Sequence, residues 1–223
     1  MRAVDELIRV LAEAVEREAP ARILNVGAGR SLAVESHLHR RGLAFVSDRV
    51  DVEARTLPAG HFAAAHVGAS WVASVESMPE VPSATYDAAF AVYVLEHVHD
   101  LVAAAREIRR VLRLGAPFIA TVPNPSAPQM RLAEHSPLWF HRLIRRADAW
   151  ELAYAFRTPE RLAETFETAG FRRQLVGRYP NFEEYLARLG SPTGALGRVL
   201  DAPIRRWNVR ALMGDACVVL EAR

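Results

Sequence analysis

Residues 23–31 read Ile-Leu-Asn-Val-Gly-Ala-Gly-Arg-Ser, and this stretch decides the fold. An apolar run typical of a buried strand reaches a Gly-x-Gly turn, and a helix-like segment follows from Leu32. Gly27 and Gly29 are able to adopt a positive φ and leave room for a ligand, because they lack a Cβ. The amino-terminal end of the following helix favours an anionic group. The pattern predicts a strand–turn–helix unit of a parallel α/β sheet, either as an ordinary tight connection or as a ligand-binding turn.

The composition is that of a single globular domain. The chain has 223 residues, of which 51% are hydrophobic and 24% charged, close to the averages for globular proteins. No apolar run approaches the roughly 20 residues of a membrane-spanning helix. The amino terminus is amphipathic and does not resemble a signal peptide. We therefore expect one domain, residues 1–223, in the cytoplasm and without a membrane partner.

The residue types exclude several functions. All 28 basic residues are arginine, which excludes lysine Schiff-base chemistry and the lysine of a P-loop. Cys217 is the only cysteine, which excludes intrachain disulfides and zinc sites with several cysteines. We expect no metal. The net charge of +2 is small and the arginine pairs are scattered, so we do not expect nucleic acid as a partner.

The second predicted strand, residues 43–47, ends beside an acidic residue. Asp48 lies twenty-one residues after Gly27. An acidic side chain at this spacing, at the end of the second strand, accepts hydrogen bonds from the ribose hydroxyls of a nucleotide cofactor. Asp51 and Glu53 are alternatives, because the sequence fixes a strand end only to within several residues. A simple turn-capping role for Asp48 is the other interpretation.

The most specific pattern lies in the middle of the chain. Residues 86–92 predict a central strand, and the tripeptide Leu95-Glu96-His97 follows it. A helical stripe of apolar residues then ends at Gly115, which is able to take the left-handed conformation of a helix end. Residues 117–122 predict a fifth strand. Because open α/β sheets bind ligands at the carboxyl ends of their strands, His97 is expected to lie beside a ligand.

The order and spacing of these motifs resemble the class I S-adenosylmethionine-dependent methyltransferases, in particular the small-molecule, type 11-like family. The resemblance covers residues 22–177 and 215–222. Residues 25–31 match the family's acidic-x-Gly-x-Gly-x-Gly turn, with asparagine for the acidic residue and serine for the third glycine. Residues 110–115 match its Arg-Val-Leu-x-x-Gly helix end. A dinucleotide fingerprint would need glycine at position 32, where this chain has leucine, so NAD and FAD are disfavoured.

The resemblance implies a fold and a function. The fold is a Rossmann-like, doubly wound α/β sheet of seven strands in the order 3-2-1-4-5-7-6, with strand 7 antiparallel. The function is transfer of a methyl group from S-adenosylmethionine to a small-molecule acceptor, with S-adenosylhomocysteine as product, by a monomer or a homodimer. The alternatives are a cofactor-binding protein without catalysis, such as a partner subunit, and, less favoured, a nicotinamide-dependent oxidoreductase.

The resemblance also assigns candidate site residues. The predicted cofactor-binding residues are Asn25, Gly27, Ala28, Gly29, Asp48, Ser74, Val75, Glu76 and Tyr93. Ser74 stands five residues before Pro79, where the family has an acidic residue beside the adenine amino group, and Glu76 lies two residues further on. His97 is predicted as the catalytic residue, a general base near the methyl group. Its alternatives are a contact with the cofactor and a purely structural role.

Two segments are longer than this fold requires. Residues 125–156 are rich in aromatic side chains and follow the fifth predicted strand, beside the expected ligand crevice. Residues 178–214 contain two further predicted helices. Each segment is a candidate substrate lid or dimer element, and packing against the sheet edge is the alternative for the first.

Overall fold

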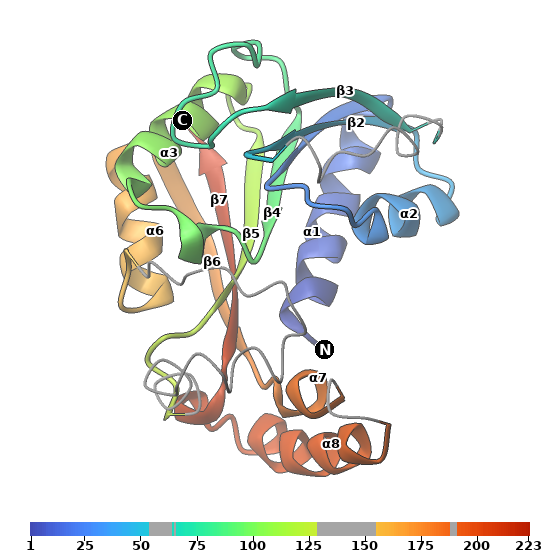
Figure 1. The fold of residues 1–223 in the computed structure, drawn as a ribbon, viewed down its shortest axis with the longest axis vertical. Helices are drawn as coiled ribbons and strands as arrows, with labels where there is room; N and C mark the ends of the chain where they lie inside the picture. The colour runs from blue at the N-terminus through green and yellow to red at the C-terminus, as the bar shows by residue number, and fades with distance from the viewer. Residues whose placement is uncertain (54–63, 65, 129–154, 188–190) are drawn as a thin grey trace.

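A computed structural model describes residues 1–53, 64, 66–128, 155–187 and 191–223. Its centre is one seven-stranded sheet in the order β3-β2-β1-β4-β5-β7-β6 (Figure 1). The strands are β1 (Ala21–Val26), β2 (Phe45–Asp51), β3 (Val67–Val72), β4 (Ala88–Val92), β5 (Pro117–Pro123), β6 (Phe171–Tyr179) and β7 (Asp215–Ala222). Strand β7 runs antiparallel to both β5 and β6, and the other pairs are parallel. The predicted Rossmann-like fold is confirmed.

Helices cover both faces of the sheet. Figure 1 shows α1 and α2 on one face, and α3 and α6 on the other. The helices are α1 (Ala3–Arg17), α2 (Ala33–Arg40), α3 (Leu101–Val111), α6 (Pro159–Thr168), α7 (Phe182–Ala187) and α8 (Ser191–Arg206), with the short 3-10 turns η3 (Leu95–His97) and η4 (Arg210–Leu212). Two separate hydrophobic cores result, one on each side of the sheet.

The apolar periodicity of the sequence explains this packing. Leu7, Leu11 and Val15 follow one another at helical spacing along α1 and are fully buried against the sheet. Strand β4 is buried over nearly its whole length, as expected for a central parallel strand covered on both faces. Truncating one of these α1 leucines to alanine is expected to cost about 2–5 kcal/mol. The cores therefore hold the carboxyl ends of the strands in fixed relative positions.

The predicted bounds of two strands are wrong. Strand β2 continues to Asp51, three residues beyond the predicted end beside Asp48, because the polar residue Arg49 is buried within it. Its charge is accommodated inside the protein by Glu35 of α2. Strand β4 begins at Ala88, two residues after the start of the predicted strand 86–92. The shift of β2 changes which acidic side chain stands at the strand end.

The segment between β6 and β7 folds into two helices that pack on each other. The carboxylate of Asp201 in α8 accepts hydrogen bonds from the backbone N–H groups of Phe182 and Glu183 at the start of α7. A Cβ on Gly197 would lie 2.4 Å from the backbone of Glu183, so the two helices meet closely. The helices predicted in residues 178–214 are confirmed. Most of the aromatic segment 125–156 lies outside the described residues.

Within the described part of the chain, no helix is both long and apolar enough to cross a lipid bilayer.

Candidate cofactor-binding site

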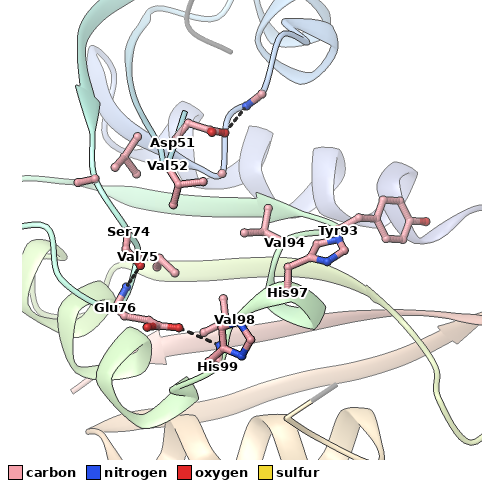
Figure 2. Close-up of a pocket in the computed structure, with 14 residues that line it drawn as sticks. Asp51, Val52, Ser74, Val75, Glu76, Tyr93, Val94, His97, Val98 and His99 are labelled. Carbon is pink, nitrogen blue, oxygen red and sulfur yellow. Dashed lines mark hydrogen bonds between the residues drawn. The ribbon is translucent and has the colours of Figure 1, made fainter. Parts of the chain in front are cut away.

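A cavity of about 440 Å³ opens at the carboxyl ends of β1, β2, β3 and β4 (Figure 2). Four chain segments line it: the glycine turn after β1, the end of β2, the residues after β3 and the turn after β4. Its volume lies within the range of small-ligand sites. The cavity therefore stands where an open α/β sheet places its ligand.

The glycine turn forms one wall of the cavity. Gly27 and Gly29 have φ values of 64° and 55°, which are strained for any residue with a Cβ. A Cβ on Gly27 would lie 2.4 Å from Val94, so this glycine allows the turn to pack against the segment after β4. A Cβ on Gly29 would meet no atom within 4 Å. Gly29 therefore borders open space, where a ligand is able to approach the backbone.

Asp51, the last residue of β2, lines the cavity and is tied to the glycine turn. One of its carboxylate oxygens accepts a hydrogen bond from the backbone N–H of Gly29 at 2.8 Å (Figure 2). The other accepts from the N–H of Glu53 at 3.1 Å. A carboxylate has about four acceptor positions. Asp51 consequently retains acceptor capacity toward the cavity.

Asp48, the favoured candidate from the sequence, does not line the cavity. It is buried inside the sheet, where Oδ2 forms an ion pair with Arg22 at 2.7 Å and accepts a hydrogen bond from the Tyr86 hydroxyl at 3.0 Å. Its Oδ1 accepts from the backbone N–H of Ala69 at 2.7 Å. Desolvation and the charge of Asp48 raise the pKa of Tyr86, which keeps the phenol protonated as a donor. Asp48 thus joins neighbouring strands, and the alternative from the sequence, Asp51, occupies the strand end.

Ser74, Val75 and Glu76 form the wall opposite the glycine turn (Figure 2). The Ser74 hydroxyl accepts a hydrogen bond from the N–H of Glu76 at 3.2 Å. Glu76 Oε1 accepts from the backbone N–H groups of His99 at 2.8 Å and Asp100 at 3.1 Å. The carboxylate of Glu76 therefore fixes the turn after β4 to the segment after β3, which closes this side of the cavity.

Tyr93 and His97 lie on the turn after β4. Tyr93 has a φ of 55°, uncommon for a residue with a side chain, and its hydroxyl donates to Asp215 Oδ2 at 2.7 Å. Burial, with the nearby charge of Asp215, raises the pKa of Tyr93, so its hydroxyl remains protonated. His97 ends η3, and its backbone N–H donates to the carbonyl of Val94 at 2.9 Å. Both residues line the cavity.

Two further predicted residues are buried and do not line the cavity. Asn25 is buried and its amide donates to Glu35 at 2.7 Å. Ala28 is also buried, and its carbonyl accepts from Arg49. The residues that the structure does bring together around the cavity are Gly27, Gly29, Ser74, Val75, Glu76, Tyr93 and His97.

The sequence interpretation missed several lining residues. Val94, Val98 and His99 flank the predicted Leu-Glu-His tripeptide and line the cavity with its His97. His99 is exposed to solvent and also lines the cavity. The position of the tripeptide at a strand end could have indicated these residues, because the whole turn lies at the sheet edge where ligands bind.

The comparisons with known proteins agree with this fold. Residues 2–175 match the family described as Methyltransferase domain, so the chain belongs to that family. No curated protein sequence matches the chain. The S-adenosylmethionine-dependent methyltransferase from Mesorhizobium loti has a similar structure, with a TM-score of 0.62 and 16% identity over 91% of each chain.

Two other solved structures are also similar. A geranyl diphosphate methyltransferase bound to GPP and sinefungin has a TM-score of 0.65 and 15% identity, over 97% of this chain and 78% of that one. The cyclase SpnF has a TM-score of 0.64 and 19% identity, over 98% of this chain and 81% of that one. These likenesses show the fold. The family match identifies the protein as an S-adenosylmethionine-dependent methyltransferase, with S-adenosylmethionine as its cofactor.

Proposed function

We propose that the cavity binds S-adenosylmethionine and presents its methyl group to a small-molecule acceptor. One observation carries this proposal: the glycine turn, the carboxylate of Asp51, the segment 74–76 and His97 come from four separate stretches of sequence and line one cavity. If the turn after β1 were only a tight connection, it would not require Asp51, the segment 74–76 and His97 to face the same cavity.

The chemistry of the cavity wall fits an adenosyl group. Asp51 retains acceptor positions for the two ribose hydroxyls, since each oxygen accepts one backbone N–H in the structure. Val75 and Val98 give the neighbouring wall an apolar surface suited to the flat adenine ring. Gly29 borders open space and permits close approach of the remainder of the cofactor. The ribose-binding role, first expected of Asp48, is accordingly proposed for Asp51.

S-adenosylmethionine, when bound, supplies a methyl group that its sulfonium already makes electrophilic. The protein therefore needs mainly to align the acceptor, exclude water and, at most, remove one proton. We assign proton removal to His97, because it lines the cavity and an imidazole accepts a proton near neutral pH. Tyr93 is assigned to the wall, since its hydroxyl already donates to Asp215.

The segment 178–214 is proposed to form the acceptor side of the site. Asp215 accepts hydrogen bonds both from Tyr93 and from the amide of Asn181, which directly precedes α7. The side chain that fixes Tyr93 thereby also fixes the start of the α7–α8 unit. A dimer contact through the same segment remains compatible with this arrangement.

Two observations support a small molecule as the acceptor. The net charge of +2 is too small to indicate nucleic acid. Two of the similar structures are geranyl diphosphate methyltransferases, whose substrate is small.

The test separates cofactor binding from acceptor class. Calorimetry with the purified chain is expected to show binding of S-adenosylhomocysteine and none of NAD. Methyl-labelled S-adenosylmethionine is then incubated with the protein and a cell extract. After the reaction the mixture is separated into ultrafiltrate, protein and nucleic acid, and the label in each fraction is counted. Label in the ultrafiltrate supports a small-molecule acceptor. Label confined to protein or nucleic acid overturns that assignment, and binding without transfer to any fraction favours the non-catalytic alternative.

A further inference from the structure

A buried ion pair lies directly beneath the glycine turn. Arg49 of β2 and Glu35 of α2 are 0% and 1% exposed, and Arg49 Nη1 lies 2.7 Å from Glu35 Oε1. Burying both charges is costly, and an apolar pair of similar volume is often at least as stable. A buried pair of this kind therefore calls for an explanation beyond stability alone.

The second terminal nitrogen of the Arg49 guanidinium forms hydrogen bonds with the glycine turn. Arg49 Nη2 donates to the carbonyls of Ala28 at 2.9 Å, Gly29 at 3.3 Å and Ser31 at 2.9 Å. Three carbonyls of four successive residues thus converge on one nitrogen. Because the planar guanidinium is a rigid fork, its ion pair with Glu35 also fixes the direction of these hydrogen bonds. Arg49 consequently sets the path of the backbone that presents Gly27 and Gly29 to the cavity.

Asn25 belongs to the same network. Its amide Nδ2 donates to Glu35 Oε1 at 2.7 Å. Asn25 and Arg49 are also paired residues in the parallel register of β1 and β2, so their side chains lie on the same face of the sheet. Where the resemblance would place a carboxylate, position 25 thus carries an amide that donates to the carboxylate of Glu35. An aspartate at position 25 would set a second carboxylate against Glu35 in a buried site.

We propose that Arg49, held by Glu35 and Asn25, is the positioning residue of the cofactor-binding turn, and that asparagine at position 25 is an adaptation to this ion pair. The inference rests on the proposed placement of S-adenosylmethionine at the glycine turn. The departure from the family pattern at position 25 then has a structural cause, whereas the contact at position 31 involves only the backbone. Asn25 donates to Glu35, and the carbonyl of Ser31 accepts from Arg49.

Moving the carboxylate from position 35 to position 25 tests this proposal most directly. The affinity for S-adenosylhomocysteine is measured by calorimetry in wild type, Asn25→Asp, Glu35→Gln and the double variant Asn25→Asp/Glu35→Gln. Each single variant is expected to bind roughly 10-fold more weakly, about 1.4 kcal/mol, and the double variant within roughly threefold of wild type, because neighbouring sites couple. Tighter binding by Asn25→Asp would show that position 25 merely lacks the family's charge, and would overturn the proposal.

A second variant guards against a loss of folding. Arg49→Met/Glu35→Leu removes both charges together and is expected to remain folded by circular dichroism. Its affinity for S-adenosylhomocysteine is expected to fall roughly 10-fold or more, and the amides of residues 27–31 to exchange faster in the ligand-free protein. Affinity within threefold of wild type would show that the pair is only structural. If wild type itself binds no S-adenosylhomocysteine, the proposed cofactor site fails instead.

Discussion

Replacing each of the two candidate aspartates by asparagine, one at a time, tests which of them binds the ribose. Asp51→Asn keeps the shape of the side chain but removes its charge and turns one acceptor into a donor. Asp51 lines the cavity, and its two oxygens are proposed to accept the ribose hydroxyls. A hydrogen bond to a charged group contributes roughly 1.5–3 kcal/mol, against roughly 0.5–1.5 kcal/mol for a neutral one. Two such bonds therefore lose roughly 2–3 kcal/mol, a fall in affinity of about 30- to 150-fold.

Asp48→Asn is the matched control, because it makes the same chemical change three residues away. Asp48 contacts Arg22, Tyr86 and the backbone of Ala69 inside the sheet. Arg22 is 45% exposed and remains hydrated when the ion pair is lost. We therefore expect a modest loss of stability, roughly 1–3 kcal/mol, with the affinity for S-adenosylhomocysteine within about threefold of wild type.

The assay is calorimetric titration of S-adenosylhomocysteine, accompanied by denaturant unfolding of each ligand-free variant. The two variants should separate, with Asp51→Asn weak in binding and Asp48→Asn weak in stability. Unchanged binding in Asp51→Asn, together with a large loss of binding in a folded Asp48→Asn variant, would refute the assignment and return the ribose role to Asp48.

Three further predictions concern other residues. Gly29→Val should abolish S-adenosylhomocysteine binding, while circular dichroism shows that the fold is retained. Gly42→Val is the control and should bind normally, because Gly42 also has a positive φ and open space around it but lies away from the cavity. His97→Ala should lower turnover roughly 10²- to 10⁴-fold with cofactor affinity nearly intact, and His99→Ala should not; a large loss of affinity in His97→Ala would exclude the general-base role. Burial lowers the pKa of His66, so the unfolded state binds its proton first and stability should fall as the pH drops below about 6.5. Denaturant unfolding at several pH values should show a smaller fall in His66→Gln, and equal slopes in the two proteins would contradict this.

The sheet was predictable because its signals are local and periodic. The apolar stripe of α1, the Gly-x-Gly turn and the strand–helix alternation each show in a short window of sequence. The end of β2 was not predictable in this way. Arg49 interrupts the apolar pattern and suggests a strand end, yet it is fully buried because Glu35, fourteen residues earlier, neutralises it. Because of this one tertiary contact, Asp48 lies within β2 and Asp51 stands at its end.

The departure at position 25 illustrates a second limit of the sequence. Read alone, asparagine for an acidic residue suggests a weakened cofactor site. The structure shows that the Asn25 amide instead donates to a buried carboxylate, that of Glu35. A network that spans β1, α2 and β2 has no signature at fixed spacing. Such a compensation becomes visible only when the three elements are placed together.

The wall that we propose to face the acceptor was the least predictable part of the cavity, and the structure supplies the reason. Tyr93 keeps an unfavourable positive φ only because its surroundings hold it there. Its hydroxyl is fixed by Asp215 at the start of β7, which also accepts from Asn181 before α7. A Cβ on the neighbouring Gly214 would lie 2.2 Å from Asn181, so the approach is close. The contact between Tyr93 and Asp215, 122 residues apart, thus shapes this wall, and we expect changes in 178–214 to alter acceptor choice while cofactor affinity is kept.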